Sequence, residues 1–405
     1  YAFTEELEAA DIVLFNTCSV RETAETRLMG HLSKLKPIKK QNPNLIIGIC
    51  GCMGQQHGQA FLKKVPYLDL VMGPRQISEV GSFIHTIQQT RKPLVKTGFD
   101  DPYTHEDVVL RKDTVRAYVS IMEGCNHHCS FCIVPLTRGP QVNRPSSEIV
   151  EQCRKLADKG YKEITLLGQN VDAWRQQKEH FGDLLCQINE LDGIERIRFT
   201  SPHPSHISPK VIESIKNAQK VCEWFHLPVQ SGSNRILKLM KRVYTKEAFR
   251  ELVAQIRSHW PEAGITTDFV VGFPGETEED FQETLHLVQD LRFDNAYCFM
   301  FSPRTGTEAA TMENQLPLET RQRRIAELID LQNKIMFERM KEQVGKVFDV
   351  MIDGPSGLRD NQWVGRSRSN HHIAFHKDSD LKPGDTVPVK ITKAKAHSLV
   401  GERVK

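Results

Sequence analysis

Three cysteines stand close together in the run Cys125-Asn-His-His-Cys129-Ser-Phe-Cys132. Three thiolates on one loop can bind three irons of a four-iron, four-sulfur cluster and leave the fourth iron without a protein ligand. An open metal position can take a reactant, as it does on a catalytic zinc ion. The spacing therefore indicates a redox cluster that would bind S-adenosylmethionine and reduce it to an adenosyl radical.

A structural zinc site is the alternative for the same triplet. His127 or His128 would then supply the fourth ligand beside the three sulfurs. Structural zinc clips rarely stand at the end of the first strand of a barrel whose other loops are rich in glycine. The predicted barrel around the triplet therefore favours an iron–sulfur cluster over zinc. Metal analysis of the purified protein would distinguish the two hypotheses.

The elements around the triplet follow the pattern of parallel βα units. From residue 111, short β-rich runs alternate with amphipathic helical stretches such as 148–159, for which Ser146 is a possible N-cap and Gly160 the stop. The pattern predicts six strands, at 117–122, 163–167, 196–200, 223–228, 266–272 and 296–301. Six repeats predict a partial (βα)6 barrel over residues 111–343, with the site on the rim where the strands end. A long helix over 318–343 is predicted to stop at Gly345.

An α/β unit is predicted for residues 1–88. Its first two strands, 12–15 and 45–49, each run into a cysteine, Cys18 and Cys52. Ligands bind at the carboxyl ends of strands in α/β sheets, so both cysteines stand where a site would be. Residues 89–110 have no clear periodicity, and we predict a linker there.

A small β-barrel is predicted for residues 346–405, from short strands at 347–352, 363–366, 373–375, 386–391 and 398–404. Counted from Lys346, this segment holds 11 Lys and Arg against 7 Asp and Glu, so it carries the whole positive surplus of a chain whose net charge is +3. A basic small barrel suits oligonucleotide binding. Trp363, Arg366 and Arg368 are the candidate RNA contacts, while a core role for the tryptophan and an ordinary solvated basic face are the alternatives.

The composition is that of a soluble globular protein. The chain has 405 residues, of which 39% are hydrophobic and 26% charged. No apolar run approaches the roughly 18 residues that a membrane helix requires. Ten cysteines scattered through a long chain suit a reducing compartment, so we expect a cytoplasmic protein without a membrane segment. The chain starts at Tyr1 rather than Met, which we interpret as a cut edge.

Five motifs resemble those of the radical methylthiotransferases: CNHHCSFCIVPLTRGP, LLGQNVDAW, HLPVQSGSNRILKLMKR, DFVVGFPGETEEDF and FSPRTGTEAA. The resemblance covers essentially the whole chain. It implies an α/β protein with a methylthiotransferase N-terminal domain, a radical S-adenosylmethionine core and a C-terminal TRAM domain that binds RNA. The most similar members act on tRNA, where they add a methylthio group to carbon 2 of N6-isopentenyladenosine next to the anticodon (position 37).

The resemblance also implies roles for individual residues. Cys125, Cys129 and Cys132 would bind the radical-generating [4Fe-4S] cluster, with Phe131 near the adenine of S-adenosylmethionine. The residues that would line the cofactor pocket are Gln169, Asn170, Gln230, Ser231, Asp268 and Arg304.

A second, auxiliary [4Fe-4S] cluster is implied as the source of sulfur. Of its three cysteine ligands the chain shows Cys18 and Cys52, and the first belongs to a segment before Tyr1. Cys50 is either a substitute for it or a buried structural thiol. Core packing is expected for the other cysteines, and a solvated loop position for His203. The other cysteines are Cys153, Cys186, Cys222 and Cys298.

The implied reaction uses S-adenosylmethionine both as methyl donor and as radical source. Its implied partners are the tRNA anticodon stem-loop and an electron donor such as flavodoxin or ferredoxin, and the protein is expected to be a monomer. Alternatives are a threonylcarbamoyl-adenosine in tRNA or an aspartate of a ribosomal protein as substrate. The basic tail and the sequence Leu136–Gly139 favour tRNA. An alternative of another class is a non-catalytic RNA-binding protein organised by zinc.

Overall fold

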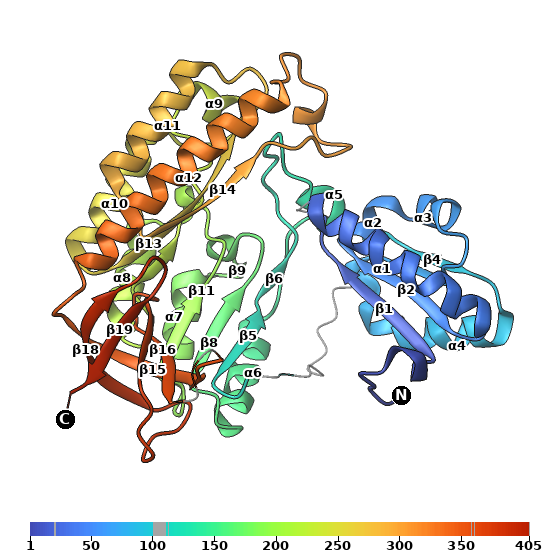
Figure 1. Cartoon of the computed structure of the whole chain (residues 1–405), viewed down its shortest axis with the longest axis horizontal. Coiled ribbons are helices and arrows are strands. Elements are labelled where there is room, and N and C mark those ends of the chain that lie inside the picture. The colour runs from blue at the N-terminus through green and yellow to red at the C-terminus, as the bar shows by residue number, and fades with distance from the viewer. Residues whose placement is uncertain (20–21, 100–110, 112, 358, 360, 405) are drawn as a thin grey trace.

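The computed structural model describes residues 1–19, 22–99, 111, 113–357, 359 and 361–404, and it divides into three parts (Figure 1). The N-terminal part is a parallel sheet in the order β1-β2-β3-β4. Its strands are β1 (Ile12–Thr17), β2 (Ile46–Gly51), β3 (Leu70–Met72) and β4 (Leu94–Lys96). Strand β4 lies inside the predicted linker, so the sheet takes in residues that the sequence assigned to a connection. Residues 100–110 of that linker lie outside the described part of the chain.

Helices cover both faces of this sheet. The helices are α1 (Glu22–Gln41), α2 (Cys52–His57), α3 (Gln59–Lys64) and α4 (Val80–Thr90). One apolar core joins Ile47 and Ile49 of β2 to Leu32 of α1. Alternate residues of β2 point to the opposite face, where Cys50 packs with Phe83 of α4. A strand buried on both faces explains why the sequence of β2 is continuously apolar.

The central part is an open sheet of six parallel strands, as the sequence predicted. The strands are β5 (Arg116–Ser120), β8 (Glu163–Leu167), β11 (Arg196–Phe199), β12 (Trp224–His226), β13 (Gly264–Val271) and β14 (Asn295–Met300). They pair as β11-β8-β5 and β12-β13-β14, and a parallel bridge between Ile197 and Val221 joins the two halves. This arrangement confirms the partial (βα)6 barrel.

Amphipathic helices cover the outside of the barrel: α6 (Ser146–Asp158), α7 (Phe181–Asn189), α8 (Pro209–Asn217), α9 (Asn234–Leu239), α10 (Lys246–His259), α11 (Glu278–Leu291) and α12 (Leu318–Lys341). Their ends follow local chemistry. Thr277 and Asp280 form a capping box at the start of α11. Ser146 is the first residue of α6 rather than its cap, which is Pro145. Gly160 and Gly345 follow helix ends with positive φ, as expected for stops.

The C-terminal part is a closed barrel in the order β15-β16-β17-β19-β18. Its strands are β15 (Val347–Pro355), β16 (Gln362–Arg366), β17 (His372–His376), β18 (Thr386–Ala394) and β19 (Leu399–Arg403). Trp363 is buried in its core together with Phe375, so the core role holds for the tryptophan. None of the described helices is long and apolar enough to cross a membrane.

The small barrel docks at the end of the central sheet where the strands begin. Glu163, the first residue of β8, is fully buried and accepts hydrogen bonds from Arg198 (2.9 Å) and Arg366 (2.6 Å). Arg368 forms an ion pair with Glu223 at 2.7 Å. Arg366 and Arg368 therefore join the two domains. Trp363 lies in the barrel core, and the two arginines are paired across the domain joint. These positions argue against direct RNA contacts by Trp363, Arg366 and Arg368, which the sequence analysis proposed.

Candidate functional site

The cysteine loop follows β5 and the short strand β6 (Met122–Glu123), at the opposite end of the barrel from the C-terminal domain. Gly124 has a φ of +78°, and a Cβ there would lie 2.2 Å from the Pro140 carbonyl oxygen. Only glycine fits so close an approach of two backbone segments. The adjacent Cys125 N–H donates to the Gly139 carbonyl at 3.2 Å, which fixes the first cysteine.

The second half of the loop is held by Ser130. Its N–H donates to the Met240 carbonyl (3.2 Å) and its hydroxyl to the Leu239 carbonyl (2.8 Å), both at the end of α9. Phe131 packs against the apolar cluster that contains Met240 and Phe273. Residues 130 and 131 thus anchor the chain between Cys129 and Cys132, so the loop is preformed.

The three thiols are set up to bind metal rather than to remain free. None is in a disulfide, and burial raises the pKa of Cys132 to about 12, with a further upward effect from Cys129 and Cys125. Without metal, the Cys132 thiol holds its proton at neutral pH. A metal ion replaces those protons, since a coordinating thiol is deprotonated outright. The donor set of three clustered sulfurs on one loop therefore fits an iron–sulfur cluster.

A half-buried cation, which the sequence did not single out, lies beside the second cysteine. Arg242 donates from Nη1 to the Cys129 sulfur at 3.4 Å and from Nη2 to the Pro228 carbonyl at 3.0 Å. Its Nε donates to the Tyr244 hydroxyl at 2.9 Å. Arg242 is the last residue of the HLPVQSGSNRILKLMKR motif, which was the one sequence signal available for it. A guanidinium here offsets negative charge on the thiolates.

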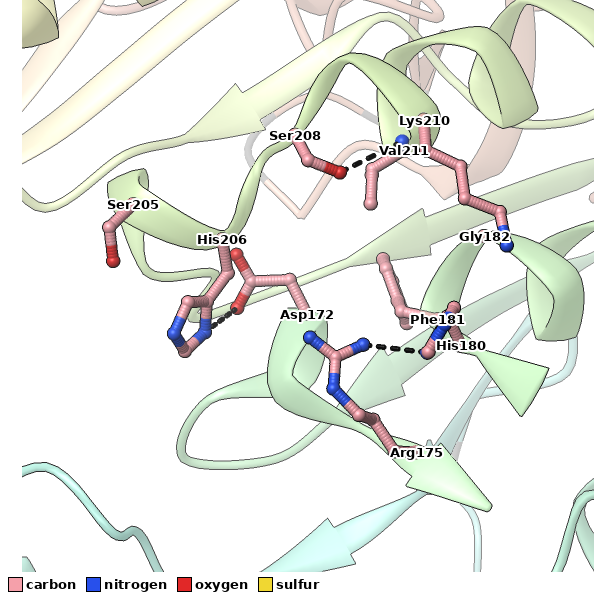
Figure 2. Close-up of a pocket in the computed structure, with 10 residues that line it drawn as sticks. All are labelled: Asp172, Arg175, His180, Phe181, Gly182, Ser205, His206, Ser208, Lys210 and Val211. Carbon is pink, nitrogen blue, oxygen red and sulfur yellow. Dashed lines mark hydrogen bonds and ion pairs between the residues drawn. The ribbon is translucent and has the colours of Figure 1, made fainter. Parts of the chain in front are cut away.

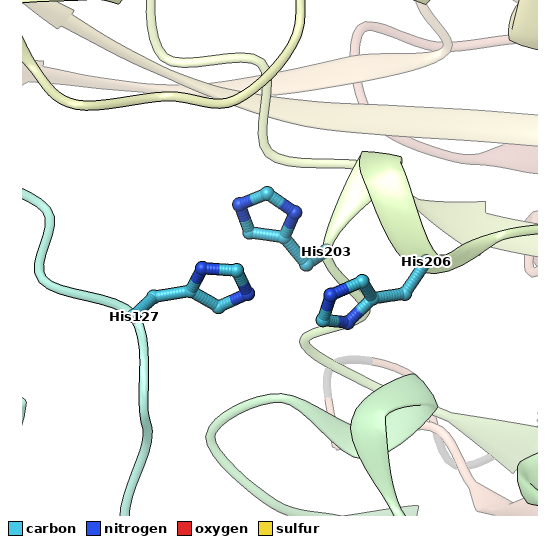
Figure 3. A group of neighbouring side chains, drawn as sticks. All are labelled: His127, His203 and His206. Carbon is cyan, nitrogen blue, oxygen red and sulfur yellow. The ribbon is translucent and has the colours of Figure 1, made fainter.

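Three histidines meet next to the loop, as Figure 3 shows. The His127 and His203 rings are stacked with centroids 4.2 Å apart, and the His206 centroid lies 5.0 Å from that of His127. Their ligand nitrogens all lie within 4.8 Å of one another. His127 is thus engaged with the other histidines, which disfavours a zinc site closed by His127 and the three sulfurs. His203 is buried, so the expectation of a solvated loop position was wrong.

The environment keeps these histidines uncharged. Burial, with Arg242 as the next cause, lowers the pKa of His203 to about 2. Burial and His127 lower the pKa of His206 to about 4. Asp172 lies below them and accepts the His203 N–H at 2.9 Å and 3.0 Å. Burial raises the pKa of Asp172 to about 8, so the group as a whole carries little charge at neutral pH.

Two of the predicted cofactor-lining residues follow β8 and reach the cysteine loop region. The Gln169 side-chain oxygen accepts the Gly124 N–H at 2.6 Å, so Gln169 supports the loop backbone. Asn170 is buried, and its amide nitrogen lies 3.4 Å from His206 Nδ1. Its Oδ1 has no hydrogen-bond partner. A buried carbonyl without a partner is costly, which makes Asn170 a candidate ligand contact.

The other predicted lining residues lie in three places. Gln230 and Asp268 lie together, because the Gln230 N–H donates to the Asp268 carbonyl at 2.8 Å, and Asp268 lies 3.4 Å from His226. Ser231 is buried and lies 3.5 Å from the Thr284 hydroxyl of α11, so it packs a helix against the sheet. Arg304 is partly exposed in the loop after β14.

The two N-terminal cysteines are brought together by strand register. Thr17 of β1 pairs with Gly51 of β2, so Cys18 and Cys52 each follow a residue of that pair. Gly51 turns the chain with a φ of +87°. Cys50 stays in the sheet core, where burial raises its pKa to about 12, which supports the structural-thiol interpretation.

A polar contact links this region to the radical domain. Arg138 of α5 (Val134–Arg138) donates to Glu123 at 3.2 Å. Burial lowers the pKa of Arg138, but its hydrogen-bond partners Cys52 and Glu123 outweigh this and raise it. The Cys52 sulfur therefore lies beside the helix that follows the cysteine loop.

Known families match three consecutive parts of the chain. Residues 1–73 match the Uncharacterized protein family UPF0004, residues 119–288 the Radical SAM superfamily and residues 341–404 the TRAM domain. Among solved structures, the radical S-adenosylmethionine methyltransferase TsrM from Kitasatospora setae is similar with a TM-score of 0.57 and 15% identity, covering 74% of this chain and 65% of that one. That likeness shows a shared fold.

Curated relatives are similar over the full length. One from Thermoanaerobacter pseudethanolicus is 45% identical over 100% of this chain and 87% of its own, and one from Desulforamulus reducens is 42% identical over 100% and 90%. Both are named tRNA-2-methylthio-N(6)-dimethylallyladenosine synthase. Relatives this similar cover the whole chain and its three matched domains, and the chain therefore belongs to the family of radical S-adenosylmethionine tRNA methylthiotransferases.

Proposed function

We propose that this chain adds a methylthio group to carbon 2 of N6-isopentenyladenosine at position 37, next to the anticodon of tRNA. The observation that carries the proposal is the cysteine loop on the rim of a six-stranded barrel, in a chain whose relatives are named for this modification. A threonylcarbamoyl-adenosine or a ribosomal aspartate as substrate has no support from the names of these relatives.

Cys125, Cys129 and Cys132 would hold a [4Fe-4S] cluster, which supplies the electron that cleaves S-adenosylmethionine. The residues around them orient and shield the reactants. Arg242 holds Cys129 in place, and the free Oδ1 of Asn170 offers an acceptor inside the barrel. The uncharged histidines His203 and His206 add no positive charge beside the cysteine loop and are not imidazolium proton donors at neutral pH. Abstraction from an unactivated C–H bond requires such a radical site.

The auxiliary cluster would be held by Cys18 and Cys52. The register of β1 and β2 supports this assignment, and the packing of Cys50 with Phe83 in the sheet core favours a structural thiol over a substitute ligand. Arg138 lies beside Cys52 and is well placed to offset negative charge on such a cluster. An electron donor such as flavodoxin or ferredoxin, a monomeric state and a cytoplasmic location complete the proposal.

RNA contacts on the C-terminal barrel would come from its outward-facing lysines. In β18, Val387, Val389 and Ile391 point into the core, so Lys390 between them points outward. Lys393 and Lys395 continue this exposed basic edge. These lysines replace Trp363, Arg366 and Arg368 as the residues that we expect to meet phosphates.

The proposal is tested by mass spectrometry of tRNA nucleosides from cells that lack the protein. The methylthio form should disappear and its unmodified precursor should accumulate, and the gene should restore it. Cys129→Ala should fail to restore it and should form no deoxyadenosine from S-adenosylmethionine, whereas Cys186→Ala, at a thiol outside both cysteine groups, should behave as wild type.

Two results would overturn the proposal. One is unchanged methylthiolation in the deletion strain. The other is purified protein that holds stoichiometric zinc without iron or labile sulfide, which would favour the zinc-organised RNA-binding protein.

A further inference from the structure

A cavity of about 280 Å³ opens on the rim of the radical domain, beside the histidine group. Its walls come from the hairpin β9 (Arg175–Gln176) and β10 (Glu179–His180), the start of α7 and the segment leading into α8 (Figure 2). The lining residues are Asp172, Arg175, His180, Phe181, Gly182, Ser205, His206, Ser208, Lys210 and Val211. His206 is shared with the histidine group that contacts His127, so the cavity borders the cysteine loop.

Two cationic side chains enter the cavity from different elements. Arg175 is exposed and contacts His180, with Nη1 2.8 Å from Nδ1, and it has no carboxylate within ion-pair distance among the residues that the structure describes. Lys210 extends from α8 toward the start of α7 (Figure 2). Its nearest carboxylate is Asp183 at 3.7 Å, and its side chain is 62% exposed. Such an exposed pair is weak, so Lys210 can turn to another anion.

The remaining polar groups also favour an anion. The Ser205 hydroxyl bonds His203 Nδ1 at 2.7 Å and the Ser208 hydroxyl accepts the Val211 N–H at 3.4 Å, so each is held at the cavity wall. Helices α7 and α8, each nine residues long, begin at the cavity, where their dipoles add partial positive charge, which at α7 the Asp183 carboxylate of the capping box partly offsets. Asp172 is the one carboxyl in the lining. Both its oxygens accept the His203 N–H, and its raised pKa of about 8 means that it is largely uncharged at neutral pH.

We propose that this cavity binds a backbone phosphate of the RNA substrate, beside the nucleotide whose base enters the radical site. The inference rests on the proposed function and adds to it the place where the substrate backbone is held. A base that reacts inside the barrel must leave its stack, while its phosphates stay at the rim. Phosphate contacts set the position of a nucleic acid on a protein, and Arg175 and Lys210 supply the required charge next to the reactive loop.

The test measures binding of an anticodon stem-loop RNA by fluorescence anisotropy at several salt concentrations. Arg175→Gln/Lys210→Gln should weaken binding roughly tenfold and reduce the salt slope by about one. The control is Arg250→Gln/Lys216→Gln, which removes the same two residue types from exposed ion pairs on α10 and α8 and should leave binding unchanged. All four side chains are on the surface, so folding should be unaffected.

A second arm locates the phosphate. RNAs carrying one uncharged methylphosphonate linkage are compared, with that linkage placed at each position around the target adenosine. One linkage should weaken binding to the wild type and have no effect on the double variant, as expected for a direct contact. The other linkages should have equal effects on both proteins.

The outcomes separate this inference from the proposed function. If the wild type binds the stem-loop and the double variant binds it equally well, the cavity does not hold a phosphate and the inference fails alone. Weaker binding of S-adenosylmethionine with unchanged RNA binding would assign the cavity to the cofactor and also overturn the inference. If the wild type neither binds nor modifies the stem-loop, the proposed function itself fails.

Discussion

The two flanking domains are attached to the radical domain in different ways. At the C-terminal joint, Glu163 is fully buried and bonded to both Arg198 and Arg366, and Arg196 donates to the Arg366 carbonyl at 2.6 Å. At the N-terminal joint, Glu123 bonds Arg138 at 3.2 Å, while Arg75 lies 3.9 Å from its other oxygen. One joint is a dense, satisfied network and the other is sparse.

The number of polar contacts at each joint is related to its distance from the cysteine loop. The dense joint closes the end of the barrel where the strands begin, far from the cysteine loop, and fixes the C-terminal barrel to the radical domain. The sparse joint lies between Cys52 and the cysteine loop, and the Glu123 Oε2 atom has no hydrogen-bond partner there. An unsatisfied buried oxygen costs stability, so this joint should open more readily than the other.

Breaking the dense joint should have the largest effect. Glu163→Gln removes the charge that pairs two buried guanidiniums, and we expect local stability to fall by about 3–5 kcal/mol. Hydrogen exchange of β8 and β16 would report the loss. Glu195→Gln is the matched control: Glu195 pairs with Lys162 at the surface, 43% exposed, so its loss should cost within about 0.5 kcal/mol. Equal exchange in the two variants would contradict the comparison.

The same change in the sparse joint should cost less. In Glu123→Gln, Arg75 keeps its hydrogen bonds to the Phe99 carbonyl (2.7 Å) and the Pro140 carbonyl (3.2 Å). Burial raises the pKa of Glu123, so its charge is disfavoured in the folded protein, and we expect the neutral Gln to change stability by less than about 1 kcal/mol, with nearly unchanged exchange in α2 and α5. A loss as large as that of Glu163→Gln would show that the two joints are equivalent.

Lowering the pH mildly should have the smallest effect on stability. It should change the local stability of the two joints differently. Burial alone would raise the pKa of Glu163, but Arg198 and Arg366 outweigh it and lower the pKa. Burial raises the pKa of Glu123, and Arg138 and Arg75 offset only part of this rise.

The two directions have opposite consequences. The stabilisation from Glu163 is present above its ordinary pKa of roughly 4.3 and is lost only as the pH falls through its lower folded pKa. Around Glu123, stability increases as the pH falls through its raised folded pKa. As the pH is lowered from neutral to just above the ordinary glutamate pKa of roughly 4.3, exchange protection should rise slightly in α5 and stay constant in β16. Parallel changes in both segments would contradict the assigned directions.

Local patterns in the sequence predicted most of the fold. The six barrel strands and the five strands of the C-terminal barrel follow from short β-rich runs between turns, and the cysteine loop follows from spacing alone. Strand β4 was missed because three residues give no readable period. Its place is set by pairing with β3, whose residues come more than twenty positions earlier.

The sequence by itself determined the three-part organisation, the cysteine loop and the family, because these depend on residue types at short spacing. Only the tertiary structure decided which charged side chains have ion-pair partners within the protein and which can bind another anion. Arg366 looked like a phosphate contact, but its partner Glu163 lies 203 positions away. Arg175 and Lys210 belong to no recognisable sequence pattern. The fold brings them, from β9 and α8, to one cavity. A side chain's availability depends on neighbours that are distant in sequence, and no local pattern encodes those neighbours.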